Sequence, residues 1–156
     1  AHGRRTGAST SIIMIDVDQF KAINDTCGHQ AGDKVLATLA SRLQKQVRPY
    51  DRIGRYGGDE FLIVLPNCAL ADAAGIAERL RSECVRKTAL FNRQPLGFTL
   101  SLGVSSSENR ARPTADRIIQ AGDLGLYQAK RLGRNRVVRF EPGPVRKKRA
   151  SRAAAK

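Results

Sequence analysis

The segment 55–65 reads RYGGDEFLIVL and decides how this chain folds. The pair Gly57-Gly58 predicts a tight turn, because glycine makes φ > 0 available and lets a bulky ligand approach the main chain. The apolar run that follows is typical of a buried strand. Asp59 and Glu60 lie at the mouth of the turn, where they fit a phosphate-and-metal site, since Mg²⁺ is held by one or two carboxylates plus substrate phosphates. A plain hairpin turn with solvated acids is the alternative.

Strand and helix patterns continue on both sides of this turn. Before it, a β-branched apolar run at 11–15 predicts a buried strand, and apolar residues at helical spacing predict a helix over 33–47, which Pro49 ends. The turn itself joins short strands at 52–55 and 60–65. After it, the patterns predict a helix over about 70–87, a strand over 97–104, a helix over 114–132 and a last strand over 136–140.

The predicted order is therefore β-α-β-β-α-β with an extra C-terminal helix and strand. This order indicates an α+β fold, an antiparallel sheet with helices on one face in the ferredoxin-like arrangement. We expect a truncated or flexible lead-in over 1–10, one folded domain over 11–141, and a disordered basic tail over 142–156, which has almost nothing to bury.

The formal net charge of the chain is +14. Six of the basic residues lie in the segment 143–156, so the rest of the chain carries +8, a value that suits a protein whose ligands are polyphosphates. We expect the tail to be a solvated charged run, and contact with anionic lipid or nucleic acid is its alternative role.

The cysteine pattern and the apolar runs limit the cellular setting. Cys27, Cys68 and Cys84 are odd in number and lack metal-ligand spacing, which favours reduced thiols in the cytoplasm over a disulfide framework. The chain has no run of about 18 apolar residues that could span a membrane, and its first residues lack the apolar core of a signal peptide.

A further carboxylate is expected beside the glycine turn. Asp16 ends the first predicted strand, which in a β-α-β-β-α-β fold lies next to the strand after the turn. We therefore expect Asp16 to face Asp59 and Glu60 across two neighbouring strands. Three carboxylates there would repel one another unless a cation lay among them. An Asx turn at the strand end is the alternative for the segment 16–18.

Several further motifs follow one another along the chain. They are DVDQFK at 16–21, ND at 24–25, GH at 28–29, GD at 32–33, RYGGDEF at 55–61, SLGV at 101–104, Asp123, LY at 126–127, AK at 129–130 and GRN at 133–135. Over about residues 11–140 this series resembles the signature of the GGDEF family of diguanylate cyclases. The resemblance implies the palm-like fold of nucleotidyl cyclases and the condensation of two GTP into cyclic di-GMP, with release of two pyrophosphates.

The resemblance also implies a metal site. It assigns Mg²⁺ or Mn²⁺ to Asp16, the carbonyl of Val17, Asp59 and Glu60, which supply the hard oxygen ligands that such ions require. Asp59 is the family's proposed base for the ribose 3′-OH. A metal-bound carboxylate is a poor base, so activation of that hydroxyl by the metal is the alternative.

Glycines and cations are implied to hold the phosphates. Gly57 and Gly58 would let phosphates approach the backbone, while Lys21, Lys130 and Arg134 would stabilise the charge that builds up in phosphoryl transfer, Lys21 as a catalytic residue. For each cation the alternative is a solvated surface charge.

The resemblance also implies that residues before and within the first predicted helix select guanine. Asn24 and Asp33 resemble the family's guanine-reading pair, and a site built to hydrogen-bond guanine should reject adenine because its polar groups would stay unpaired. Asp33 could instead be only a helix N-cap. Phe20 fits either the base pocket or the core, and His29 belongs to the same series of substrate-binding motifs.

A product-inhibition site is implied by Arg48, Asp51 and Arg79. The first two match the family's Arg-x-x-Asp pattern, in which arginine binds guanine and phosphate of a cyclic di-GMP dimer, and the third matches its second arginine. A surface ion pair is the alternative.

The implied reaction requires a homodimer. Each domain holds one GTP, so two domains must face each other with twofold symmetry, which an attached sensory or receiver domain usually supports in the family. Residues 1–10 do not reproduce the family's lead-in Asp-x-Leu-Thr-Gly-Leu-x-Asn-Arg.

Two other function classes remain as alternatives to the cyclase. The first is a catalytically weak domain that only binds GTP or cyclic di-GMP. The second is a nucleic-acid-binding domain, which is disfavoured because the chain has no tryptophan and few aromatic residues for stacking bases.

Overall fold

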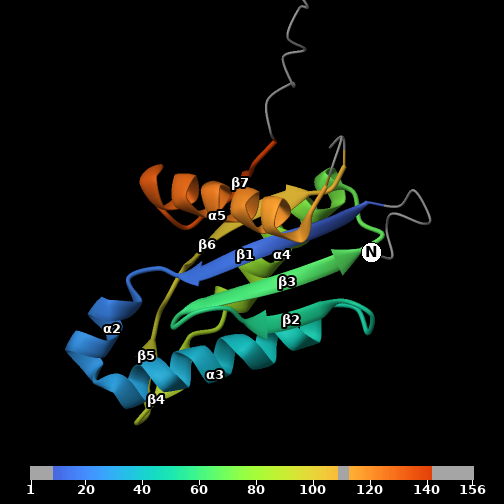
Figure 1. Ribbon diagram of the computed structural model, residues 1–156. Helices are drawn as coiled ribbons and strands as arrows, with labels where there is room; N and C mark the ends of the chain where they lie inside the picture. Colours follow the sequence, from blue (N-terminus) through green and yellow to red (C-terminus); the bar gives the residue numbers. More distant parts are fainter. Residues whose placement is uncertain (1–8, 109–112, 142–156) are drawn as a thin grey trace, which may run out of the picture.

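The computed structural model describes residues 9–108 and 113–141, and Figure 1 shows their arrangement. The predicted lead-in up to residue 8 and the predicted tail lie outside the described residues. The elements, in chain order, are β1 (Thr10–Val17), α2 (Phe20–Cys27), α3 (His29–Gln46), β2 (Arg52–Arg55), β3 (Glu60–Pro66), α4 (Leu70–Val85), β4 (Ala89–Phe91), β5 (Gln94–Leu96), β6 (Leu100–Ser106), α5 (Ala115–Arg131) and β7 (Val137–Arg139).

One mixed sheet forms the centre of the domain. Its strand order is β2-β3-β1-β6-β7, so the first strand lies in the middle, as the β-α-β-β-α-β order predicts. The pairs β2–β3, β3–β1 and β1–β6 are antiparallel, whereas the extra strand β7 runs parallel to β6. The α+β ferredoxin-like prediction is confirmed for the core, and the parallel edge strand is an addition to it.

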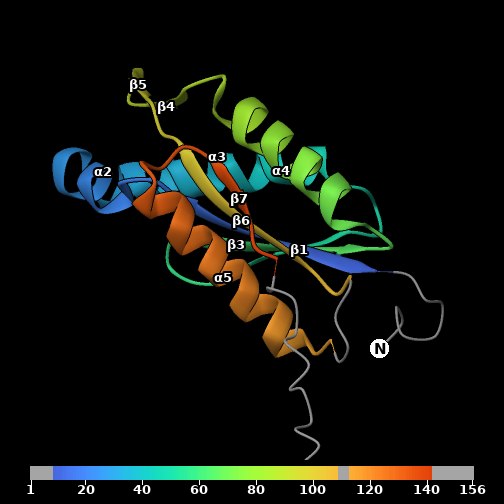
Figure 2. The same cartoon turned by 90° about the horizontal axis from the view of Figure 1, so that it is seen from above.

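Both faces of the sheet are covered by helices. Alternate side chains of β1 point to opposite faces: Ile13 and Ile15 join the large core with α3 and α4, while Ile12 and Met14 pack with Ile118 and Leu126 of α5. Figure 2 shows α5 on the side of the sheet opposite α3 and α4. The expectation of helices on one face therefore holds for α3 and α4 and is wrong for α5. Because both faces are covered, the sheet offers no open platform for stacking bases.

The local structure differs from the prediction in two places. The helix predicted over 33–47 begins at His29 and is preceded by the separate helix α2, so Asp33 lies inside α3 and Gly28 is the N-cap residue. The small hairpin β4–β5, which projects from the domain in Figure 2, was not predicted. Its turn residues Asn92 and Arg93 both have positive φ, and the turn contains no glycine that would have revealed it.

The packing of α5 on the sheet depends on glycine. Gly103 of β6 lies directly under α5, and a β-carbon on it would overlap the backbone of Gly122 and Leu126. The same place holds Gly125, whose added β-carbon would lie 3.2 Å from the Cα of Gly103. The helix therefore approaches the strand as closely as backbone atoms allow, which fixes the position of its C-terminal end relative to β1.

Candidate active site

The end of β1 and the glycine turn meet at one edge of the sheet, at the left in Figure 1. Asp16 is paired with Glu60 in the β1–β3 register. The N–H of Val17 donates a hydrogen bond to the carbonyl of Asp59, with 3.3 Å between the two atoms. The structure thus confirms the expectation that Asp16 faces the acidic residues of the turn across neighbouring strands.

The face of β1 that packs against α5 changes from apolar to acidic along the strand. After Ile12 and Met14 come Asp16 and then Asp18, and α5 changes in parallel from apolar residues to Lys130. Lys130 Nζ lies 2.7 Å from Asp16 Oδ2. The helix therefore brings its cation to the first carboxylate of the strand end.

Asp18, to which the sequence analysis gave no role, is fully engaged within the protein. It is buried, and its carboxylate accepts hydrogen bonds from the hydroxyls of Thr99 (2.7 Å) and Ser101 (2.6 Å) and from the N–H of Asn135 (3.0 Å). These bonds join β1 to β6 and to the loop after α5, and they replace the Asx turn considered from the sequence. The alternation of side chains along the segment 16–18 could have placed both aspartates on one face.

Burial dominates the electrostatics of Asp16. Only 6 % of its surface is exposed. Burial raises the pKa of this carboxyl, the hydrogen bond and charge of Lys130 lower it, the charges of Asp59 and Glu60 raise it again, and the result is a pKa of about 6. An ionised Asp16 is therefore costly at neutral pH without a further cation nearby.

We expect Asp16→Asn to remove a pH dependence of stability. Because the folded pKa lies above the usual 3.8, the folded state binds the proton more tightly, and stability falls as pH rises from about 4 to 6. The ionised carboxylate costs about 3 kcal/mol above that window. In metal-free buffer the variant should therefore gain stability over wild type by up to that amount between pH 4.5 and 7.5, measured by urea denaturation.

The exposed Asp116→Asn is the matched control for this comparison and should follow the wild-type pH profile. Lys130 should not confound the result, because its side chain is 34 % exposed and can turn to solvent when Asp16 is replaced. If Asp16→Asn and wild type lost stability in parallel between pH 4.5 and 7.5, this account of Asp16 would be wrong.

The donor set fits a metal that also binds substrate phosphates. Among residues 9–108 and 113–141, no three His, Cys, Asp or Glu side chains converge closely enough to hold a metal by themselves. One buried carboxylate, Asp16, lies beside Asp59 and Glu60 at the strand end. Mg²⁺ typically takes one or two carboxylates and completes its shell with phosphates and water. The observed arrangement meets that requirement with oxygen donors only.

The glycine turn is held by its own arginine. Arg55 Nε donates to the carbonyl of Gly58 at 2.9 Å and to that of Gly57 at 3.3 Å. Neither glycine has positive φ, so the turn does not use the conformational freedom suggested from the sequence. A β-carbon on Gly57 would lie 2.9 Å from Glu60 Oε2, whereas Gly58 faces open space that a ligand can enter. Gly57 therefore leaves room for the Glu60 side chain, and Gly58 leaves the backbone open on its side.

The predicted guanine-reading pair lies on the helices next to the turn. Asn24 Oδ1 is buried against Gly32 and has no hydrogen-bond partner among the described residues. Asp33 follows Gly32 and lines a pocket of about 450 Å³ between α3 and β2, which Arg55 and Phe61 also line. Asn24 itself does not line that pocket. A buried polar oxygen normally has a hydrogen-bond partner, so the Oδ1 of Asn24 is an acceptor with unused capacity beside Gly32.

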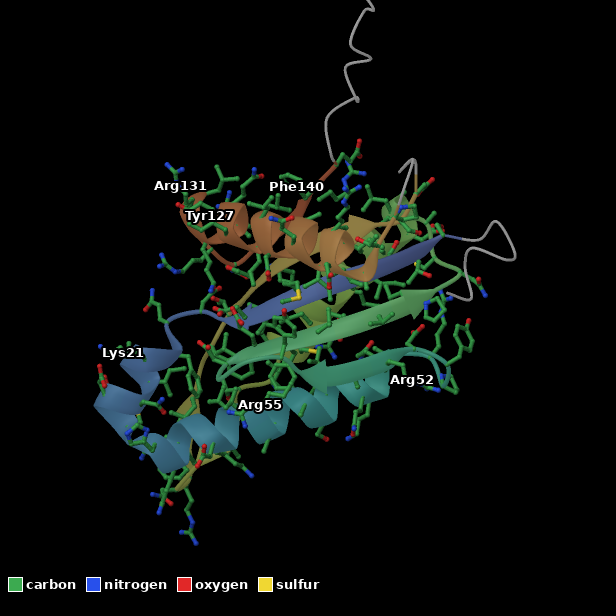
Figure 3. All side chains as sticks on the ribbon, viewed as in Figure 1. Lys21, Arg52, Arg55, Tyr127, Arg131 and Phe140 are labelled. Carbon is green, nitrogen blue, oxygen red and sulfur yellow. The ribbon has the colours of Figure 1, made fainter. Side chains whose placement is uncertain are left out.

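The other residues that the sequence analysis assigned to substrate binding do not line this pocket. Phe20 packs against the large core and does not line that pocket, which favours its core role, and His29 is exposed at the start of α3. Lys21 is exposed on α2 at the same end of the molecule as Arg131, the neighbour of Lys130 (Figure 3). Arg134 is exposed in the loop after α5.

The three residues of the predicted inhibitory site are linked through the end of α3. The N–H of Arg48 donates to Asp51 Oδ2 at 2.8 Å, and Arg79 of α4 donates to the carbonyl of Gln46 at 3.0 Å. Asp51 is buried, and its Oδ1 has no partner among the described residues. The Arg48 guanidinium instead contacts Tyr50, at 3.1 Å from its hydroxyl. Arg48 and Asp51 are thus not a surface ion pair.

The fold and this site define a nucleotidyl-cyclase-like domain with a GGDEF turn. The family model described as "Diguanylate cyclase, GGDEF domain" matches residues 1–136. The chain belongs to the GGDEF family of diguanylate cyclase domains.

Curated relatives and solved structures agree with this assignment. The chain is 44% identical over 137 residues to diguanylate cyclase DosC of Escherichia coli, covering 88% of this chain and 30% of DosC. It is 45% identical over 134 residues to the response regulator PleD of Caulobacter vibrioides, covering 85% of this chain and 29% of PleD. The GGDEF domain of DgcB from Caulobacter crescentus, solved in complex with c-di-GMP, superposes with a TM-score of 0.84 at 30% identity, covering 90% of this chain and 83% of that one.

The chain spans about a third of the length of the curated relatives it matches. In the described part of the chain, none of the helices combines the length and the apolar character that crossing a bilayer demands.

Proposed function

We propose that this domain condenses two GTP into cyclic di-GMP and releases two pyrophosphates. The observation that carries the proposal is the buried carboxylate of Asp16, which is held by Lys130 beside Asp59 and Glu60 at an open glycine turn. A buried acid with a raised pKa in such a place is typical of a catalytic site. The family membership of the chain supplies the reaction class.

Four residues at the strand ends would bind the metal and accept the proton. Asp16, the Val17 carbonyl, Asp59 and Glu60 would hold Mg²⁺ or Mn²⁺, which supplies Lewis-acid stabilisation of phosphate charge and lowers the pKa of an oxygen bound to it. Asp59 would accept the proton of the ribose 3′-OH.

Cations on both sides of the turn would hold the triphosphate. Lys21 comes from α2, whereas Lys130 and Arg134 come from α5 and the loop after it. They would bind phosphate oxygens and stabilise the charge of the leaving pyrophosphate. Lys130 would exchange its Asp16 partner for phosphate when the substrate arrives.

The substrate base would be guanine. The carboxylate of Asp33 can accept both the N1–H and the exocyclic amine of guanine, and Asn24 adds an amide with a buried, unpartnered oxygen. Adenine offers no matching pair of donors, so it would leave these polar groups unpaired. We therefore expect strong preference for GTP over ATP.

Two copies of the domain are needed for the reaction. Each 3′-OH must attack the α-phosphate of the other GTP, so the active site is completed when two glycine turns face each other. Further domains of the full-length protein, such as the sensory or receiver domains found in this family, would hold the copies together.

The test is product formation by a dimerised chain. The domain fused to a parallel coiled coil should convert GTP, but not ATP, into cyclic di-GMP in Mg²⁺, and chelation should stop the reaction; chromatography of the nucleotides measures this. Absence of product at high protein concentration, with cyclic di-GMP still bound, would instead establish a binding module. The unpartnered Oδ1 of Asp51 is the observation that favours this second function.

We expect Arg48→Ala to relieve product inhibition. Asp51 accepts from the main-chain N–H of Arg48, so the substitution leaves that hydrogen bond in place and removes only the guanidinium. The cyclic di-GMP concentration that halves the rate should rise roughly tenfold or more, because an arginine that binds guanine and phosphate together contributes more than one hydrogen bond. Uninhibited turnover should not change.

Lys45→Ala is the matched control for this substitution, since it removes an exposed cation from the last turn of α3 without touching Asp51. It should keep wild-type inhibition. Equal inhibition of Arg48→Ala and wild type would show that the pair Arg48–Asp51 does not bind the product.

A further inference from the structure

The loop that follows α5 has an unusual backbone. Gly133, Arg134 and Asn135 have φ values of +113°, +63° and +47°, three consecutive residues on the left-handed side. Such a conformation is costly for arginine and persists only where surrounding contacts hold it. Arg134 is also one of the residues proposed above to bind the triphosphate. The conformation of the loop sets the position and direction of the Cα–Cβ bond of Arg134.

The end of α5 provides the first restraint on this loop. The N–H of Gly133 donates to the carbonyl of Lys130 at 3.4 Å, and the N–H of Arg134 donates to that of Ala129 at 3.0 Å. These bonds close the helix in the manner of a glycine C-cap. They fix the loop to the helix, but they do not fix its far end at Asn135.

Two side chains from other elements hold Asn135. Its N–H donates to Asp18 at the end of β1, with 3.0 Å between the atoms. Its side-chain Oδ1 accepts from Arg81 of α4 at 2.6 Å. Arg81 is in turn held by Glu78, one turn earlier on the same helix, at 2.6 Å. The loop is therefore clamped between a buried carboxylate and an arginine that belongs to neither the metal site nor the pocket.

We propose that Arg81 is a positioning residue for the phosphate-binding loop. Its bond to Asn135 holds the left-handed backbone at Arg134 in place. The guanidinium of Arg134 is then already positioned for the triphosphate, and nucleotide binding does not have to order the loop. Among the described residues, the Arg134 side chain makes no hydrogen bond or ion pair of its own, so its position depends on its backbone. This inference rests on the proposed function of the site.

The test compares two guanine nucleotides that cannot react, 3′-deoxy-GTP and 3′-deoxy-GMP, by calorimetry in Mg²⁺ with wild type and Arg81→Met. The Kd of the triphosphate should rise roughly fivefold, the effect of about one hydrogen bond. The Kd of the monophosphate should not change, because it lacks the phosphates that Arg134 would bind. A purely structural loss would weaken both nucleotides.

Two further variants make the result specific. Arg86→Met removes an arginine that pairs with Glu83 at the same spacing and does not contact the loop, and it should bind both nucleotides as wild type does. Asn135→Gly removes the acceptor of the Arg81 bond while retaining a residue that adopts positive φ. Adding Arg81→Met to Asn135→Gly should then have no further effect on the triphosphate Kd.

The possible outcomes separate this inference from the proposed function. If wild type binds 3′-deoxy-GTP and Arg81→Met binds it with the same Kd, the role of Arg81 is wrong but the proposed function stands. The same conclusion follows if Arg81→Met weakens the binding of both nucleotides equally. A wild-type chain that binds no guanine triphosphate would overturn the proposed function and the role of Arg81 with it.

Discussion

Asp59→Asn should abolish the formation of cyclic di-GMP, with a loss in kcat of about a thousandfold or more, since the loss of a general base alone costs about 10²–10⁴-fold. Asp59 lies in the turn next to Glu60, whose strand partner is the buried Asp16. An asparagine cannot accept the 3′-OH proton and is a weaker ligand for a divalent cation. Both proposed roles of the carboxylate are therefore lost together.

The variant should nevertheless fold. The carbonyl of Asp59, which accepts from the N–H of Val17, belongs to the main chain and is unaffected by the substitution. Thermal unfolding should therefore match wild type, and binding of GTP without metal should persist because Asn24 and Asp33 are intact. The exposed Asp116→Asn, in the first turn of α5, should retain full activity. More than a tenth of wild-type turnover in Asp59→Asn would refute its catalytic assignment.

Gly103→Ala should destabilise the domain by about 3 kcal/mol or more, the upper range for overpacking a close-packed interior. The added β-carbon would overlap backbone atoms of Gly122 and Leu126, which cannot move aside as a flexible side chain would. The strand and α5 would have to separate, and Lys130 would then move away from Asp16. Urea denaturation, followed by circular dichroism, measures the loss.

Gly75→Ala is the control for this change. Gly75 is exposed on α4, and a β-carbon there would meet nothing within 4 Å. Because alanine favours the helix, this variant should gain about 0.5–1 kcal/mol. Similar effects of both substitutions would show that α5 does not depend on close approach to Gly103.

Sequence patterns were sufficient for several elements of the core. The strand β2 was predicted at its observed bounds, and β3, α4 and α5 were predicted within one or two residues. Their signals are local, since they come from apolar periodicity and, for α5, from Thr114, whose hydroxyl accepts a hydrogen bond from the N–H of Arg117 and caps the helix. The helix α2 was missed because its eight residues include Asn24, Asp25 and Thr26, which favour turns as much as helices.

The sequence by itself also determined where the acids and glycines of the candidate site meet. Asp16, the glycine turn and Asp59-Glu60 are acids and glycines at strand ends, and the β-α-β-β-α-β order was sufficient to bring them to one edge of the sheet. Adjacent strands pair in a regular register, so residues at their ends meet predictably.

Only the tertiary structure decided which partners these residues have. Lys130 bonds to Asp16 across 114 positions of sequence, Asp18 binds the loop at Asn135, and Arg81 reaches that loop from α4. Each of these contacts depends on which face of the sheet a helix covers and how closely it approaches. For α5 that distance is set by backbone contact over Gly103, a packing interaction between distant segments that no local pattern in the sequence encodes.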